Sequence, residues 1–285
     1  MQNLRENNEG VAGIVVAVML IGLLFTFLSL VQVNWVPDWS EEREAEHIDS
    51  VANQFTQMRF AVDILSTVDQ SGNMITAPIT LGTQEIPLPF LRSDQSFGYI
   101  KISPDNYMLK ITDKNPTLHE FPLGAFQYSS VNSNYLNVEF IYEGGGIITN
   151  QDTGNNMYIK PSYDVDYSSD VDITLDVTNF IETGGKTYTT GNSGIQIQLE
   201  YVQKNSNTIS NVNTLAITTE YHSSWNNFFN DSLKNAGLDY GASKHFVIYS
   251  DADDLVVDFD DALSVDITLT EIEIDLQIGP GWSEV

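Results

Sequence analysis

The chain has 285 residues, a formal net charge of −27 and no cysteine. The absence of cysteine excludes disulfide bonds, thiolate metal sites and a cysteine nucleophile, and the acidic balance argues against nucleic-acid binding, which requires a basic surface. The carboxylates form either a hydrated surface suited to a saline exterior or a cation-binding surface, and the solubility of acidic surfaces favours the first interpretation.

An uncharged apolar segment at residues 11–36 dominates the N-terminal part of the chain. A helix rises about 1.5 Å per residue, so roughly 20 such residues cross the hydrocarbon core of a bilayer. Residues 11–36 are therefore predicted to form a transmembrane helix, whose apolar core runs from Val11 to Val33. Trp35 and Trp39 follow it, where aromatic side chains collect at the membrane surface. A secretory signal peptide carries small residues there, so removal of the whole segment is disfavoured.

Residues 1–10 are predicted to form a short cytoplasmic leader. The leader contains one basic side chain, Arg5, and the residues that follow the span are acidic. Basic residues flanking a span stay preferentially on the cytoplasmic side. We therefore expect a single-pass protein of the cell membrane, with its N-terminus inside and the bulk of the chain outside the cell.

The residues directly before the span form a recognisable motif. Glu9-Gly10-Val11-Ala12 resembles the class III signal peptide of archaeal type IV pilin-like proteins. In that family a prepilin peptidase cuts after the glycine and leaves the apolar helix on the mature protein. The resemblance implies cleavage between Gly10 and Val11, a prepilin-type peptidase as a partner, and possible self-assembly into a filament through the apolar helix. Bacterial pilins carry glutamate at the fifth mature position, which is Val15 here. An uncleaved signal anchor is the alternative.

Residues 37–66 are predicted to form an extracytoplasmic amphipathic helix. Apolar side chains recur there at spacings of three and four, as on one face of an α-helix; they are Ile48, Val51, Ala52, Phe55, Met58, Val62 and Leu65. Their partner is either the β domain of the same chain or a neighbouring subunit. Pro37 predicts a kink between the span and this helix. A long helix that leaves the membrane and packs on a β domain is also the pilin arrangement.

Residues 67–285 are predicted to form an extracellular, antiparallel β-sandwich-like domain, which makes the whole chain mainly β. Short segments rich in Ile, Val, Thr and Tyr are separated by turn residues. Residues 164–177 alternate apolar and aspartate side chains, so we expect one strand with a core face and a carboxylate face. Apolar positions in the last strand change parity, which predicts a β-bulge near Thr270–Glu271 or a strand that passes from one sheet to the other.

One short helix is predicted within the β-rich part. Trp225, Phe228, Phe229 and Leu233 lie at helical spacing, after the capping residues Ser223 and Ser224 and before Gly237. The aromatic face either closes one end of the sandwich or forms a ligand site. The first interpretation is favoured because aromatic residues at helical spacing usually belong to a core.

The sequence contains no recognisable catalytic motif. The four histidines are far apart in the chain and none has the spacing of a zinc site. A serine-hydrolase elbow and a phosphate-binding loop are also absent. The best metal candidate is a calcium site of Asp251, Asp253, Asp254 and Asp258, because calcium prefers several oxygen ligands. The stretch lacks the glycine and terminal glutamate of an EF-hand loop, so a solvated acidic loop is the favoured alternative. We expect no other cofactor.

These observations favour a non-enzymatic surface protein of the pilin-like class, anchored in the membrane or assembled through its apolar helix, with a structural or adhesive role. A single-span adhesion protein that does not polymerise is the second hypothesis, and an extracytoplasmic hydrolase is the third. The ligand of the outer domain does not follow from the sequence.

Overall fold

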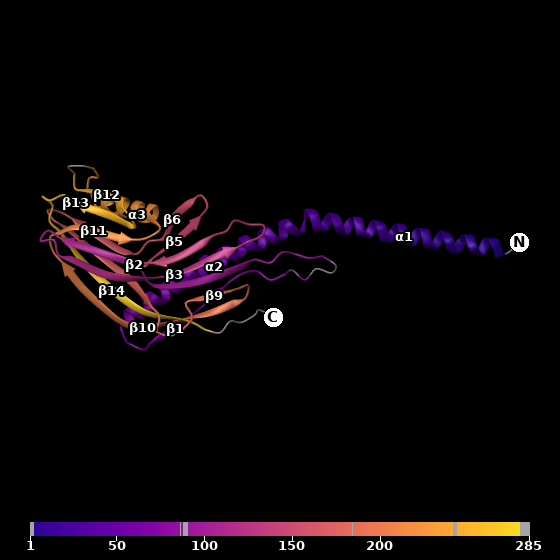
Figure 1. Cartoon of the computed structure of the whole chain (residues 1–285), viewed down its shortest axis with the longest axis horizontal. Coiled ribbons are helices and arrows are strands. Elements are labelled where there is room, and N and C mark those ends of the chain that lie inside the picture. Colours follow the sequence, from indigo (N-terminus) through magenta and orange to yellow (C-terminus); the bar gives the residue numbers. More distant parts are fainter. Residues whose placement is uncertain (1–2, 86, 88–90, 184, 242–243, 280–285) are drawn as a thin grey trace.

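The computed structural model describes residues 3–85, 87, 91–183, 185–241 and 244–279, with side chains from residue 11 onward except at 105–106. Two helices open the chain, α1 (Asn3–Asn34) and α2 (Val36–Val68), separated only by Trp35. Residues 3–10 of the predicted leader continue α1, and residues 1–2 lie outside the described part. Figure 1 shows α1 projecting away from a β-rich body along which α2 runs.

The helix axis changes direction where α1 meets α2 (Figure 1), as the proline predicted. Pro37 lies in the first turn of α2. Proline has no backbone N–H, so it cannot supply the helical hydrogen bond to the carbonyl four residues earlier. The bend leaves the two helices end to end without a loop between them.

The strands of the described residues form two sheets. The five-stranded sheet has the order β1 (Met74–Thr80), β10 (Gly194–Ile209), β14 (Val265–Ile278), β8 (Val171–Ile181) and β7 (Ser162–Tyr167). The nine-stranded sheet has the order β12 (Phe246–Asp251), β13 (Asp254–Phe259), β11 (Val212–Thr218), β2 (Phe97–Asp113), β3 (Leu118–Val131), β4 (Glu139–Glu143), β5 (Gly146–Gln151) and β6 (Gly154–Ile159), while β9 (Tyr188–Gly191) pairs with the start of β2. The predicted mainly-β fold behind an N-terminal helix is confirmed. One pair, β8 with β14, is parallel rather than antiparallel.

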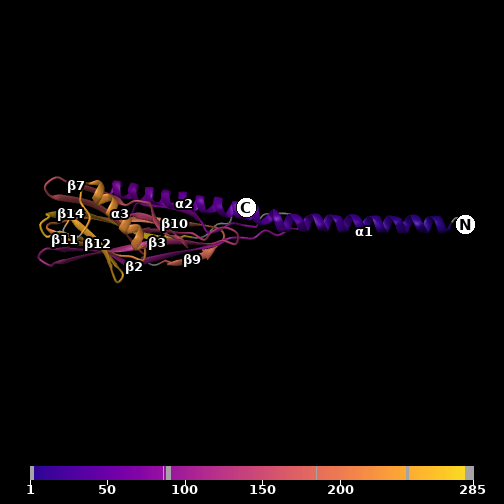
Figure 2. The same ribbon diagram turned by 90° about the horizontal axis from the view of Figure 1, so that it is seen from above.

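The body contains two separate hydrophobic cores on opposite faces of the same strands. On β3, Leu123 faces the first core and Tyr128 the second, and on β8 the change comes between Val177 and Phe180. Figure 2 shows α2 lying along one side of the body. Its apolar face lines the second core; these residues are Ile48, Val51, Phe55, Met58, Ala61, Val62 and Leu65. The predicted amphipathic helix is confirmed, and its stripe packs against the β domain of its own chain.

The two sheets touch where the cores are divided. Gly124 on β3 donates its backbone N–H to the side-chain oxygen of Asn179 on β8, over 3.1 Å. A Cβ atom at Gly124 would lie 1.9 Å from the carbonyl oxygen of Phe180. Only glycine permits two backbones to approach this closely.

The predicted bulge near Thr270–Glu271 is wrong. β14 pairs with β8 residue by residue from Val265 to Asp275, and the irregularity lies instead in its other neighbour, β10, between Tyr201 and Gln203. The parity change has another cause, because the two halves of β14 bury opposite faces. Residues Val265, Ile267 and Leu269 enter the first core, and Ile272, Ile274 and Leu276 enter the second.

The single strand predicted over residues 164–177 is also wrong, because a turn at Ser168–Asp170 divides it into the β7–β8 hairpin. Its alternation is confirmed, with Val171 and Ile173 buried and Asp164 and Asp172 exposed. The short helix is confirmed as α3 (His222–Asn235), which covers the first core with its aromatic face and ends before Gly237. The aromatic side chains therefore belong to the core. The predicted capping by Ser223 and Ser224 is wrong, because both residues lie within the helix and Tyr221 is its N-cap.

Candidate functional site

The apolar part of α1 is exposed over most of its length, although Val31 near its end is buried. The helical segment Val11–Val68 contains the one stretch, among the residues searched, that is long and apolar enough to cross a membrane, and only 6% of that stretch is buried within the chain. Val11 is 60% exposed and Val33 is 71% exposed, while Trp35 lies beyond them at 49%. Burying such a surface in lipid or protein is strongly favourable. Gly10 and Val11, the predicted processing residues, lie within α1.

Glu44 fastens the start of α2 to the β body. Its carboxylate accepts backbone N–H bonds from Ser133, Asn134 and Tyr135 in the β3–β4 loop, at 3.0, 2.8 and 2.7 Å. The side chain is 1% exposed. Three converging N–H groups form a concave anion-binding site, so the negative charge is compensated although it is buried.

We expect Glu44→Gln to lower the free energy of unfolding by about 2–3 kcal/mol, because charge-assisted hydrogen bonds are lost and an amide N–H faces backbone donors. Urea denaturation of the full chain in detergent measures the loss. Glu42→Gln is the matched control, since Glu42 is exposed on the same helix, and it is expected to leave the midpoint unchanged. Equal midpoints for the two variants would show that the carboxylate clamp contributes nothing.

A second link joins the end of α1 to the loop between β1 and β2. The side-chain amide of Gln32 donates to the backbone carbonyl of Arg92 at 2.7 Å and accepts the backbone N–H of the same residue at 3.1 Å. Leu91 lies beside it, in a groove of about 320 Å³ lined also by Leu24, Phe25 and Leu28. Leu91 and Arg92 therefore lie against the end of α1.

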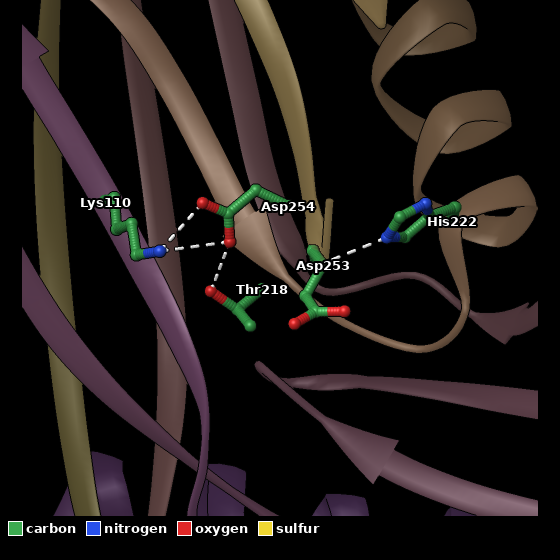
Figure 3. A network of polar contacts seen from close by, with 5 residues as sticks. All are labelled: Lys110, Thr218, His222, Asp253 and Asp254. Atoms are coloured by element: carbon green, nitrogen blue, oxygen red, sulfur yellow. Dashed lines mark hydrogen bonds and ion pairs between the residues drawn. The ribbon is translucent and has the colours of Figure 1, made fainter. Parts of the chain in front are cut away.

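The four aspartates of the predicted calcium site occupy the β12–β13 hairpin. Asp251 and Asp254 face each other across the turn, and Asp258 lies farther along β13. Figure 3 shows that the Asp254 carboxylate is held by Lys110, at 2.7 and 3.0 Å, and by Thr218. The backbone carbonyl of Asp253 accepts a bond from His222 at 3.2 Å, when that nitrogen carries the proton. The Asp254 carboxylate is therefore already engaged in an ion pair with Lys110.

The pKa shifts of the carboxyl groups in the hairpin agree with the ion pair between Lys110 and Asp254. Burial raises the pKa of Asp254, but the hydrogen bonds from Lys110 and Thr218 outweigh it and hold the pKa below its usual value. Burial, together with repulsion from Asp261, raises the pKa of Asp258. Within the described part of the chain, no three acidic or imidazole side chains lie close enough to hold a metal ion. Calcium binding stays a prediction that this geometry does not support.

The structure gives each histidine its own set of contacts. Each contacts a different group: His47 lies 3.3 Å from the Tyr128 hydroxyl, His119 lies 3.8 Å from the Asp113 carboxylate, His222 contacts Asp253, and His245 lies 3.4 Å from the Tyr167 hydroxyl. Each therefore has a structural neighbour.

Glu143, at the end of β4, is a buried acid that the sequence analysis did not single out. It is fully buried, and its Oε1 accepts the indole N–H of Trp225 at 3.0 Å. Oε2 has no hydrogen-bond partner among the described residues. Burial raises the pKa of Glu143 to about 8, and the side-chain interactions with Thr219 and Trp225 oppose this effect only partly. The carboxyl is therefore largely protonated at neutral pH, and without exposed surface it holds α3 against β4 rather than contacting a solute.

Comparison with known proteins adds no relative. No protein-family model, curated protein or solved structure matches the chain.

Glu143 makes stability depend on pH. The folded state keeps a proton that the unfolded chain releases near its ordinary pKa of 4.5, so the contribution is complete below that pH and is lost as the pH rises to about 8. Between pH 7 and 8, above the usual histidine pKa, we expect the free energy of unfolding to fall by about 1 kcal/mol, which is less than the limiting value of about 1.4 kcal/mol per pH unit because the folded carboxyl itself begins to lose its proton.

Glu143→Gln is expected to flatten this slope while its amide oxygen keeps the Trp225 bond, and urea titrations at several pH values measure it. The control is Glu120→Gln, which changes an exposed carboxylate and is expected to retain the wild-type slope. A slope unaffected by Glu143→Gln would place the titrating group elsewhere.

Sequence reasoning missed Glu143, Glu44 and Gln32. Glu143 precedes three glycines and looks like part of an exposed turn, and its partner Trp225 lies 82 residues away. Glu44 is one of several acids that follow the predicted span, whereas Gln32 is a polar residue near the end of an apolar segment. That last feature, a polar side chain inside a predicted span, is the one signal that pointed to a partner.

Proposed function

We propose that this chain is a pilin-like cell-surface protein, held in the membrane or in a filament through Val11–Val33, that displays its acidic β body outside the cell in a structural or adhesive role. The observation that carries the proposal is that the two parts of one nearly continuous helix have different surroundings. The first half exposes apolar side chains, and the second half is built into a core.

The sequence motif supports the same proposal. Glu9-Gly10-Val11-Ala12 directly precedes the exposed apolar stretch, as expected for a leader that a prepilin-type peptidase removes. The acidic surface of the body supports an outward position, since it disfavours contact with anionic lipid headgroups. Neither nucleic acid nor a cofactor enters this function.

Mass spectrometry of the native N-terminus tests the processing step. We expect a mature chain that begins at Val11, and we expect Gly10→Leu to accumulate uncleaved. Gly13→Leu is the matched control, because a Cβ at Gly13 meets nothing within 4 Å, and it is expected to be processed normally. Recovery of the wild type with residues 1–10 intact would contradict the pilin-like assignment and leave a signal anchor.

A single-span adhesion protein that does not polymerise is the second candidate, because lipid alone can cover the exposed face of α1. Electron microscopy of sheared cell-surface material separates the two. Filaments that contain the chain indicate assembly, and its retention in the membrane fraction without filaments indicates the anchored monomer.

A further inference from the structure

The groove formed by α1 and Leu91 lies on the membrane side of the outer end of the proposed span. Along the helix, Leu28 lies about 6 Å and Leu24 about 12 Å from Gln32. The outer half of a hydrocarbon core is roughly 15 Å thick. With Val33 at the outer boundary, the groove that contains Leu91 is at the level of the acyl chains.

The side chains of the groove suit lipid. Leu24 and Phe25 are 53% and 64% exposed, Leu91 is half-buried against the helix, and none of the lining residues is charged. The groove is continuous with the exposed face of α1. A lipid chain that covers that face therefore also covers Leu91.

The backbone of Arg92 meets the main condition for entering the membrane. Within hydrocarbon, an unpaired backbone N–H or C=O costs several kcal/mol. At Arg92 both groups are paired, by the two ends of the Gln32 amide. The Arg92 side chain is exposed and long enough to reach the lipid headgroups while its stem stays in the apolar layer.

We propose that Leu91 and Arg92 form a second membrane contact, in which Leu91 enters the outer leaflet beside α1 and Gln32 holds the backbone of Arg92 there. The partner is lipid acyl chains. The proposal rests on the membrane anchoring of α1 proposed above. It adds that the β body has a fixed height and rotation relative to the lipid surface, because it contacts the bilayer at two points.

The absence of cysteine makes a direct test possible. Single-cysteine variants Leu91→Cys, Leu24→Cys and Leu118→Cys of the full chain are labelled with an environment-sensitive fluorophore and reconstituted into phosphatidylcholine vesicles that contain doxyl-labelled lipid. Leu118 is a matched exposed leucine, 53% accessible, at the opposite end of β3 and about 43 Å from the end that pairs with Phe97.

We expect the labels at positions 91 and 24 to shift to shorter wavelength and to be quenched severalfold more strongly than the label at 118. Adding Gln32→Ala is expected to reduce quenching at position 91 and to leave it unchanged at 24. Circular dichroism confirms that each variant keeps its β structure.

The outcomes separate the two proposals. Quenching at position 24 without quenching at position 91 overturns the proposed insertion of Leu91 and leaves the proposed anchoring through α1 intact. Loss of quenching at both positions overturns the anchor itself. A label at 91 that is shielded from water but not quenched by doxyl lipid, in a sample where copies crosslink through that position, assigns the groove to a second copy of the chain and overturns the lipid proposal.

Discussion

Gly124→Ala is expected to destabilise the body by more than about 4 kcal/mol, a loss that exceeds almost all single substitutions. The new Cβ would lie 1.9 Å from the Phe180 carbonyl oxygen and 2.7 Å from the Phe180 nitrogen, so one sheet must move as a whole. That movement opens both cores, because Gly124 stands between them.

The yield of folded full-length chain in detergent and its urea midpoint measure the effect of Gly124→Ala. Gly191→Ala is the control, since the nearest atom there is the flexible end of Leu81 at 3.7 Å, and we expect it to retain the wild-type midpoint within experimental error. If Gly124→Ala matches that control, the two sheets are not in backbone contact.

Phe55→Ala is expected to cost about 3–5 kcal/mol, the usual range for removing a buried aromatic side chain. Phe55 is fully buried on α2. Its ring lies 5.4 Å from the ring of Phe126 on β3 and 5.6 Å from that of Phe140 on β4. The substitution therefore leaves a cavity where the helix joins the nine-stranded sheet.

Chemical denaturation measures this loss, and the same helix supplies the control. Phe60 is 64% exposed, so Phe60→Ala is expected to change the free energy of unfolding by no more than about 0.5 kcal/mol. Comparable losses for the two variants would mean that α2 packs with a different face toward the body.

Local patterns were sufficient for the helices and for the core-facing side chains of β7 and β8. The three-and-four spacing from Ile48 to Leu65 identified α2, and the aromatic spacing after Ser224 identified α3. The alternation of Val and Ile with Asp identified which side chains of β7 and β8 face the core. These features depend on residues a few positions apart, so the sequence displays them directly.

Features that depend on distant residues were not predictable. The parity change in β14 was visible, but a single strand does not reveal that two cores lie on opposite sides of it, so a bulge was inferred instead. The parallel pairing of β8 with β14 leaves no mark on either strand alone. The link between Gln32 and Arg92 joins residues 60 positions apart, and nothing near either residue points to the other.

The direct junction of α1 and α2 has a mechanical consequence. With only Trp35 between the helices, a pull on the N-terminal end of α1 reaches α2 without first stretching a flexible tether. α2 lies lengthwise in the second core and is clamped at Glu44, so the load shears a row of packed side chains simultaneously instead of peeling them one by one. The packing of α2 in the second core therefore resists separation of the β body from α1.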